Sequence, residues 1–175
     1  FINLISEMEK TKTVNISHHS DDPNVGLAST KELMQYKMFV GDTGLFVTLA
    51  FKDKAFTENV IYEHLLNDKL STNLGYLYEN VVAQMLTASG NKLFYYTWPT
   101  DSGKHRYEVD FLLSRGTKIT PVEVKSSSYK THASLDEFCK KFSSRLTNDR
   151  YLIYTKDYAH KESVKYIPAY MAAFL

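Results

Sequence analysis

Two carboxylates and a lysine on neighbouring predicted strands are the residues of this chain best suited to chemistry. Residues 107–113 and 121–125 are rich in β-branched and aromatic side chains, and a turn-like Ser-Arg-Gly-Thr segment follows the first stretch. Both stretches are therefore predicted to be β-strands joined by a hairpin-like return. Such a return places Asp110, Glu123 and Lys125 side by side on one edge of a sheet.

The alternation of side chains along a strand predicts which of these residues share a face. Successive side chains point to opposite faces, so Glu108 and Asp110 are expected to lie opposite Val109 and Phe111. Carboxylates among apolar neighbours are costly to hold without a partner. A divalent cation such as Mg²⁺ prefers oxygen ligands and would be such a partner. The alternative is that these residues form ordinary salt bridges on a sheet.

The composition of the 175-residue chain is that of an ordinary globular protein, with 43% hydrophobic and 23% charged residues. The net charge of +1 gives no global positive field, so any binding of nucleic acid needs local positive charge. The single Cys139 excludes an intrachain disulfide framework and a multi-thiolate zinc site. No apolar run approaches the ~18 residues of a membrane span, and no signal peptide is recognisable. We therefore expect a cytoplasmic protein with no membrane partner.

Hydrophobic periodicity and turn residues predict alternating helices and strands. The predicted helices cover residues 1–12, 42–51, 57–67, 72–89 and 134–142. The predicted strands cover residues 13–17, 36–40, 93–98, 107–113, 119–125 and 150–155, with a short edge strand at 164–167. This order predicts an α/β fold. The first helix and the first two strands would suit the tail of a winged-helix module, with the polar loop between the strands as its wing.

Four short motifs together resemble a known family. They are Gly-Tyr-Leu-Tyr-Glu-Asn-Val-Val-Ala at residues 75–83, Tyr-Tyr-Thr-Trp at 95–98, Glu-Val-Asp-Phe at 108–111 and Val-Glu-Val-Lys-Ser at 122–126. In this order they are similar to the nuclease-like DUF4143 domain, which forms the C-terminal part of bacterial and archaeal AAA-type ATPases. The order of Asp110 and Glu123-Val124-Lys125 resembles the active-site signature of the PD-(D/E)XK nuclease superfamily, without the proline that sometimes precedes the aspartate.

The resemblance implies a restriction-endonuclease-like fold over residues 42–175, with a mixed central sheet flanked by helices. It implies that residues 1–41 are the C-terminal part of a winged-helix-like segment, because such a segment lies between the ATPase and the nuclease-like domain in the family. No Gly-x-x-x-x-Gly-Lys-[Ser/Thr] phosphate-loop motif occurs in this chain. An ATPase partner would therefore be an upstream module of the full-length protein.

The resemblance also assigns roles to individual residues. Asp110 and Glu123 would ligate Mg²⁺ or Mn²⁺, and Glu79 on the long predicted helix fits the upstream acidic residue that completes the metal shell. Lys125 would orient the attacking water or help to deprotonate it, and would neutralise the scissile phosphate. Glu108 shares the predicted face of Asp110, but we interpret it as a solvated or ion-paired strand residue.

Two functions of different classes follow from this pattern. The first is metal-dependent hydrolysis of phosphodiesters in DNA, with Asp110, Glu123 and Lys125 as catalytic residues. The second is a catalytically inactive nuclease-fold module that binds DNA or a protein and regulates the upstream ATPase. In either case, basic and hydroxyl side chains near the predicted site are candidate contacts to the nucleic-acid backbone. These are Lys104, Arg106, Ser126 and Lys130.

Overall fold

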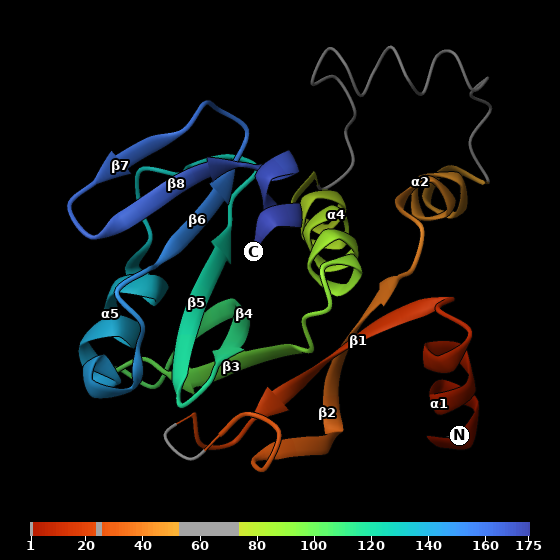
Figure 1. The fold of residues 1–175 in the computed structure, drawn as a ribbon, viewed down its shortest axis with the longest axis horizontal. Helices are drawn as coiled ribbons and strands as arrows, with labels where there is room; N and C mark the ends of the chain where they lie inside the picture. The colour runs from red at the N-terminus through yellow and green to blue at the C-terminus, as the bar shows by residue number, and fades with distance from the viewer. Residues whose placement is uncertain (1, 24–25, 53–73) are drawn as a thin grey trace.

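The structure is a computed structural model that describes residues 2–23, 26–52 and 74–175. The described residues form one eight-stranded mixed sheet with the strand order β2-β1-β3-β4-β5-β6-β8-β7 (Figure 1). Its strands are β1 (Val14–Ser20), β2 (Lys31–Val40), β3 (Leu93–Pro99), β4 (Arg106–Arg115), β5 (Lys118–Val124), β6 (Tyr151–Tyr154), β7 (Ala159–Lys161) and β8 (Val164–Pro168). Its helices are α1 (Ile2–Lys10), α2 (Thr43–Phe51), α4 (Leu74–Ala88), α5 (Ala133–Lys141) and the short 3₁₀ helices η1 (Ser143–Arg145) and η2 (Ala169–Phe174).

Two hydrophobic clusters cover opposite faces of this sheet. Along β4, Leu112 packs in one cluster and Leu113 in the other, as the period of a strand requires. The first cluster contains α5, whose predicted apolar stripe is confirmed because Leu135, Phe138 and Phe142 are all buried. The second contains the buried face of α4 and the helix η2. The central strands β4 and β5 are therefore covered on both faces.

A β-bulge interrupts the simple alternation of β4. Phe94 pairs with Leu112 and Tyr96 with Val109, so Asp110 and Phe111 together lie opposite one residue of β3. As a result Val109 packs in the first cluster and Phe111 in the second. The prediction that Val109 and Phe111 share one face is therefore wrong, because the extra residue changes the parity of the strand.

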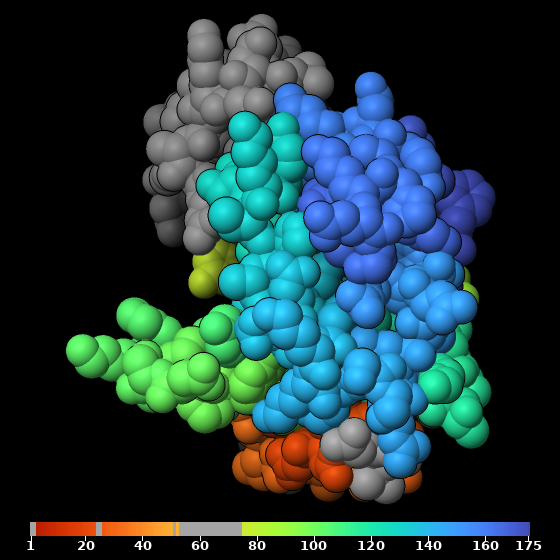
Figure 2. All heavy atoms as spheres, turned by 90° about the vertical axis from the view of Figure 1, so that its left-hand side faces the viewer, coloured from red at the N-terminus to blue at the C-terminus, as the bar shows by residue number. Residues whose placement is uncertain are grey.

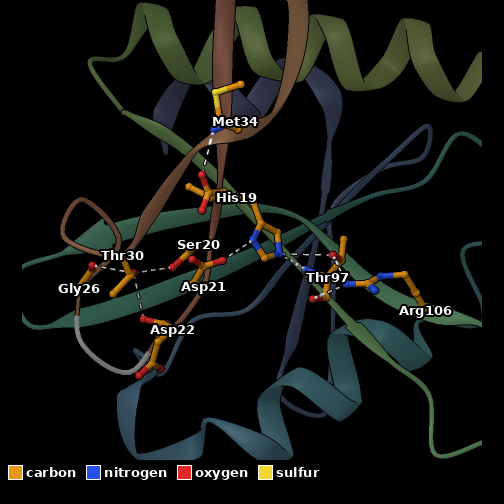
Figure 3. A network of polar contacts seen from close by, with 10 residues as sticks. His19, Ser20, Asp21, Asp22, Gly26, Thr30, Met34, Thr97 and Arg106 are labelled. Atoms are coloured by element: carbon orange, nitrogen blue, oxygen red, sulfur yellow. Dashed lines mark hydrogen bonds and ion pairs between the residues drawn. The ribbon is translucent and has the colours of Figure 1, made fainter. Parts of the chain in front are cut away.

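The ribbon formed by β1 and β2 joins the sheet through β3. β1 pairs in parallel with β3 only over Ser17–His19, and the buried His19 side chain then extends the connection. Its Nε2 accepts a hydrogen bond from the backbone N–H of Thr97 at 3.2 Å, while Nδ1 lies 3.3 Å from Asp21 Oδ1 (Figure 3). Because Nε2 is the acceptor, the ring proton is assigned to Nδ1. This histidine therefore joins two strands and is not left as a free base.

A buried asparagine fixes the C-terminal end of β2 to α4. Asn80 Oδ1 accepts the backbone N–H of Val40 at 2.8 Å, and its Nδ2 donates to the carbonyl of Val40 and to Thr43 Oγ1, both at 3.0 Å. The side chain thus acts as a substitute for a neighbouring strand at this edge. In the same region Asp42 caps α2, since its side chain accepts the N–H of Leu45 at 3.0 Å.

Most predicted elements coincide with observed ones, with two differences. β2 begins at Lys31, five residues earlier than predicted. β8 is not an edge strand, because the unpredicted three-residue strand β7 pairs with its outer side. The predicted helix at residues 57–67 lies outside the described residues. The winged-helix origin of residues 1–41 stays a prediction; their strands belong to the same sheet as the rest.

In the described part of the chain, no helix combines the length and the apolar character needed to cross a membrane.

Replacing Asn80 by Ala should lower the free energy of unfolding by about 1–3 kcal/mol, because the buried Asn80 side chain and two backbone groups of the half-buried Val40 lose their hydrogen bonds. Chemical denaturation followed by circular dichroism measures this change. Asn148→Ala is the control, because Asn148 is exposed, and we expect it to change the stability by less than about 0.5 kcal/mol. Equal stability of the two variants would contradict the role of Asn80.

Candidate functional site

Asp110 and Glu123 are buried carboxylates on neighbouring strands in the middle of the sheet. They are 8% and 3% exposed. The ladder between β4 and β5 begins at the pair Phe111–Val122, and just beyond this pair Asp110 Oδ2 accepts the backbone N–H of Val124 at 2.8 Å. The carboxylate therefore takes the place of a strand carbonyl. The two acids lie together as predicted, but on central strands and not at the edge of the sheet.

Glu123 has one oxygen in an ion pair and one without a partner. Its Oε1 lies 2.8 Å from Lys125 Nζ. Its Oε2 is buried and has no hydrogen-bond partner in the described structure. A buried carboxylate oxygen without a donor is costly, and such exceptions occur at sites that bind a ligand or ion. This oxygen is therefore the atom of the site best suited to bind a cation.

A lysine that the sequence analysis did not identify occupies the other side of the site. Lys37 Nζ, from β2, lies 2.5 Å from Glu108 Oε1, 3.4 Å from Glu79 Oε2 and 3.9 Å from Asp110 Oδ1. It also lies 5.4 Å from the centre of the Tyr95 ring. The structure thus brings Glu79 and Asp110 together through a shared lysine. Glu108 forms an ion pair with Lys37, in agreement with our interpretation of Glu108 as a solvated or ion-paired strand residue.

One signal in the sequence could have identified Lys37. Phe39 lies two positions further along the same predicted strand, and its side chain is buried against Phe111 with ring centres 5.6 Å apart. Residues two apart on a strand share a face. A lysine on the face of a core phenylalanine needs a carboxylate partner. The position of Phe39 therefore indicates that Lys37 is paired with an acid.

Burial and like charge raise the pKa values of both central acids. Burial is the largest cause for Asp110, followed by the charges of Glu123 and Glu79, and together they hold its pKa well above its ordinary value. Lys37 and the Val124 N–H act in the opposite direction but do not cancel the effect. Burial also raises the pKa of Glu123, although the charge and hydrogen bond of Lys125 oppose it. Both acids therefore favour a proton or another cation beside them.

The two lysines are held in the charged state. Burial lowers the pKa of Lys125, but the adjacent Glu123 outweighs this effect and the net shift is upward. For Lys37, burial is again the largest single influence and lowers the pKa, while Asp110, Glu79 and Glu108 together raise it above its ordinary value. A general base needs a depressed pKa. The geometry therefore favours Lys125 as a charged positioning group over a base.

Only part of a metal-binding arrangement is present in this conformation. The hard oxygen donors of Glu79, Asp110 and Glu123 suit Mg²⁺ or Mn²⁺, and the unpartnered Glu123 Oε2 fits a cation. Among the described residues, however, no three His, Cys, Asp or Glu side chains are gathered so that they could hold a metal ion. Instead, the ammonium group of Lys37 contacts Glu79 and Asp110.

A cavity of about 550 Å³ opens beside Lys37. It is bounded by β2, by the start of α4 and by β4. The residues that line it are Lys37, Met38, Phe39, Gly75, Tyr76, Glu79 and Glu108. Glu79 and Glu108 are therefore accessible from this side.

The candidate nucleic-acid contacts lie on loops around the site. Lys104 and Arg106 are exposed at the β3–β4 turn, which projects from the body of the molecule in Figure 2. Arg106 Nη2 donates to Thr97 Oγ1 at 3.0 Å (Figure 3). Ser126 and Lys130 follow β5, with Ser126 half-buried and Lys130 exposed. Their contact with nucleic acid stays a prediction.

Most of the candidate site lies in a part of the chain that matches a known protein family. Residues 74–171 match the family described as Domain of unknown function (DUF4143). This range covers more than half of the chain, and the protein belongs to that family. The match includes Glu79, Asp110, Glu123 and Lys125 but begins after Lys37. Searches of curated proteins and of solved structures found no match.

The raised pKa of Asp110 predicts a specific dependence of stability on pH in buffer without divalent cations. Above the ordinary value of 3.8, the folded state keeps a proton that the unfolded state has lost, so the free energy of unfolding falls as the pH rises through this window. Asp110→Asn keeps an oxygen acceptor for Val124 and removes the titration. We expect a shallower pH slope and higher stability than wild type at neutral pH.

Urea denaturation between pH 4 and pH 8 measures both slopes. Asp101→Asn, in the exposed turn after β3, is the matched control and should keep the wild-type slope. Parallel curves for wild type and Asp110→Asn would show that Asp110 has an ordinary pKa.

Proposed function

We propose that this domain hydrolyses phosphodiester bonds in DNA with the help of Mg²⁺ or Mn²⁺. The proposal rests on one observation above all. Glu123 presents a buried, unpartnered oxygen beside the buried Asp110, and the charged Lys125 lies 2.8 Å from the other oxygen of Glu123. The mixed sheet with helices on both faces, and the position of these residues on adjacent central strands, support a restriction-endonuclease-like arrangement of the PD-(D/E)XK type.

Asp110 and Glu123 would hold the cation, with Glu79 as the third acid. When bound, the cation would lower the pKa of the attacking water and stabilise the charge that develops on the phosphate. The raised pKa values of both central acids support this assignment, since each gains from a neighbouring positive charge. The hydrogen bond from Val124 to Asp110 fixes the orientation of one ligand before the cation arrives.

Lys125 contributes a fixed positive charge next to the reacting phosphate. Its ion pair with Glu123 holds the ammonium group in place, and its raised pKa keeps it protonated at neutral pH. It would therefore orient the attacking water and attract the phosphate without accepting a proton. Positively charged groups placed in advance around a developing charge are among the largest contributions to catalysis.

The wider surroundings of the site fit a backbone-binding role. Lys104 and Arg106 on the projecting β3–β4 turn, and Ser126 and Lys130 after β5, would contact phosphates on either side of the scissile bond. By resemblance to its family, the domain would work at the C-terminus of a larger AAA-type ATPase, which would supply the ATP-driven step.

Incubation with supercoiled plasmid, single-stranded DNA and branched DNA in MgCl₂ or MnCl₂ tests the activity. We expect cleavage that EDTA abolishes and that falls on the order of 10²-fold or more in Asp110→Asn and in Lys125→Met, because each removes a charge from the reacting centre. Gel electrophoresis of the products measures the rate.

Glu9→Gln and Lys10→Met are the matched controls, because both residues are exposed on α1, whose main contacts are with β1. They should cleave at the wild-type rate. Wild-type protein that leaves all three substrates intact in both metals would refute the nuclease proposal.

The contacts of Lys37 favour a second candidate, a nuclease-fold module that binds DNA or a protein without cutting. Its ammonium group already contacts Glu79, Glu108 and Asp110 without a metal. The chain's net charge of only +1 also fits weak nucleic-acid affinity. Salt-sensitive binding to DNA without cleavage would support a DNA-binding module, and no binding at low salt would support a protein partner.

A further inference from the structure

The ammonium group of Lys37 is placed where a cation of the proposed site would act. It is shared by three carboxylates from two different elements, Glu79 of α4 and both Glu108 and Asp110 of β4. Two of these, Glu79 and Asp110, are proposed metal ligands. A metal ion and the ammonium group would therefore draw on the same oxygens.

The three contacts of Lys37 are unequal. The contact to Glu108 is the shortest at 2.5 Å, whereas those to Glu79 and Asp110 are 3.4 and 3.9 Å. Glu108 is also the most exposed of the three carboxylates, with 40% of its side chain accessible. Lys37 can thus keep its strongest contact at the outer side of the site while it releases the two inner acids.

The strand that carries Lys37 is fixed, but its side chain has space to move. Asn80 holds the end of β2 through Val40, and Phe39 packs against Phe111. Beyond the strand, the cavity of about 550 Å³ borders Lys37, Glu79 and Glu108. A lysine has a flexible four-carbon stem, so its ammonium group can move into this cavity without a shift of β2.

The charges of the cluster leave a place for a divalent ion. Glu79, Glu108, Asp110 and Glu123 are opposed by Lys37 and Lys125, so four formal negative charges face two positive ones. A divalent cation would neutralise the remaining two. Charge balance therefore permits the ion to enter while Lys37 stays charged beside Glu108.

We propose that Lys37 is an internal counter-cation that competes with the divalent metal for Glu79 and Asp110, and that metal loading moves its ammonium group away from these two acids into the adjoining cavity while it keeps its contact to Glu108. Lys37 thereby sets the metal affinity of the site. This role rests on the proposed function, because it assumes that Glu79, Asp110 and Glu123 bind the metal. It assigns a site residue to β2, outside the family match at residues 74–171.

Titration of MnCl₂ into wild-type protein and Lys37→Met by isothermal calorimetry, without nucleic acid, tests the competition. Because the variant lacks the competing charge, we expect it to bind Mn²⁺ more tightly than wild type, with a Kd at least about tenfold lower. Lys31→Met is the matched control. Lys31 is exposed on the same strand, and its replacement removes an equal charge without changing a residue of the cluster. Its Kd should equal that of wild type.

A second measurement uses the wild-type side chain and does not depend on the folding of Lys37→Met. Reductive methylation with ¹³C-formaldehyde keeps the charge of each lysine and gives each an NMR signal, and the Lys37 signal is identified by its absence in Lys37→Arg. Addition of the diamagnetic MgCl₂ should shift this signal until it reaches saturation. The Kd from this titration should equal the Kd that calorimetry gives for MgCl₂ under the same conditions.

The outcomes separate the two proposals. Equal or weaker Mn²⁺ binding in Lys37→Met, or a Lys37 signal that Mg²⁺ leaves unchanged while calorimetry shows binding, would overturn the competition and leave the metal site standing. Absence of Mn²⁺ binding in both wild type and Lys37→Met would refute the metal site itself, and the competition with it.

Discussion

The burial of negative charge in the middle of a sheet is the constraint on which this structure depends. Asp110 and Glu123 lie between two hydrophobic clusters, where an isolated carboxylate would be strongly destabilising. The chain meets this requirement with two lysines and a backbone N–H group that all converge on the acids. Replacing a well-packed apolar pair by such an arrangement seldom increases stability. The cluster is therefore not explained by its contribution to folding, and the proposed metal binding would account for it.

The charged groups of the cluster come from four elements. β4 supplies Glu108 and Asp110, β5 supplies Glu123 and is followed by Lys125, α4 supplies Glu79, and β2 supplies Lys37. Two polar side chains fix the ribbon of β1 and β2, which carries Lys37. Asn80 joins the end of β2 to α4, and His19 joins β1 to β3. Asn80 adjoins Glu79, and Thr97, which His19 binds, pairs with Glu108. The contacts that fix the N-terminal ribbon are therefore next to the site.

Local pattern was sufficient to predict most of the secondary structure and the meeting of Asp110 with Glu123 and Lys125. Those predictions rest on the alternation of side chains along a strand and on turn residues, which are local properties of a few positions. The β4 bulge was beyond such reasoning, because an extra residue in one strand is set by pairing with β3 and leaves the composition of β4 unchanged. The contacts of Lys37 were also beyond it, since they depend on how a ribbon 42 to 73 residues away in sequence folds back. Phe39 gave the one local indication that Lys37 would be covered. The short strand β7 was missed because three residues carry too little pattern.

The position of β3 inside the sheet has a consequence for the limits of this domain. β3 is the first strand of the family-matched range, and its outer side is covered only because β1 pairs with it over Ser17–His19. A chain reduced to residues 74–171 would present β3 as a bare sheet edge, with the aromatic side chains of Tyr95 and Tyr96 along it. Unpaired edges of this kind favour association with other chains. The sheet therefore extends beyond the family-matched range, and the N-terminal ribbon covers an edge that residues 74–171 alone would expose.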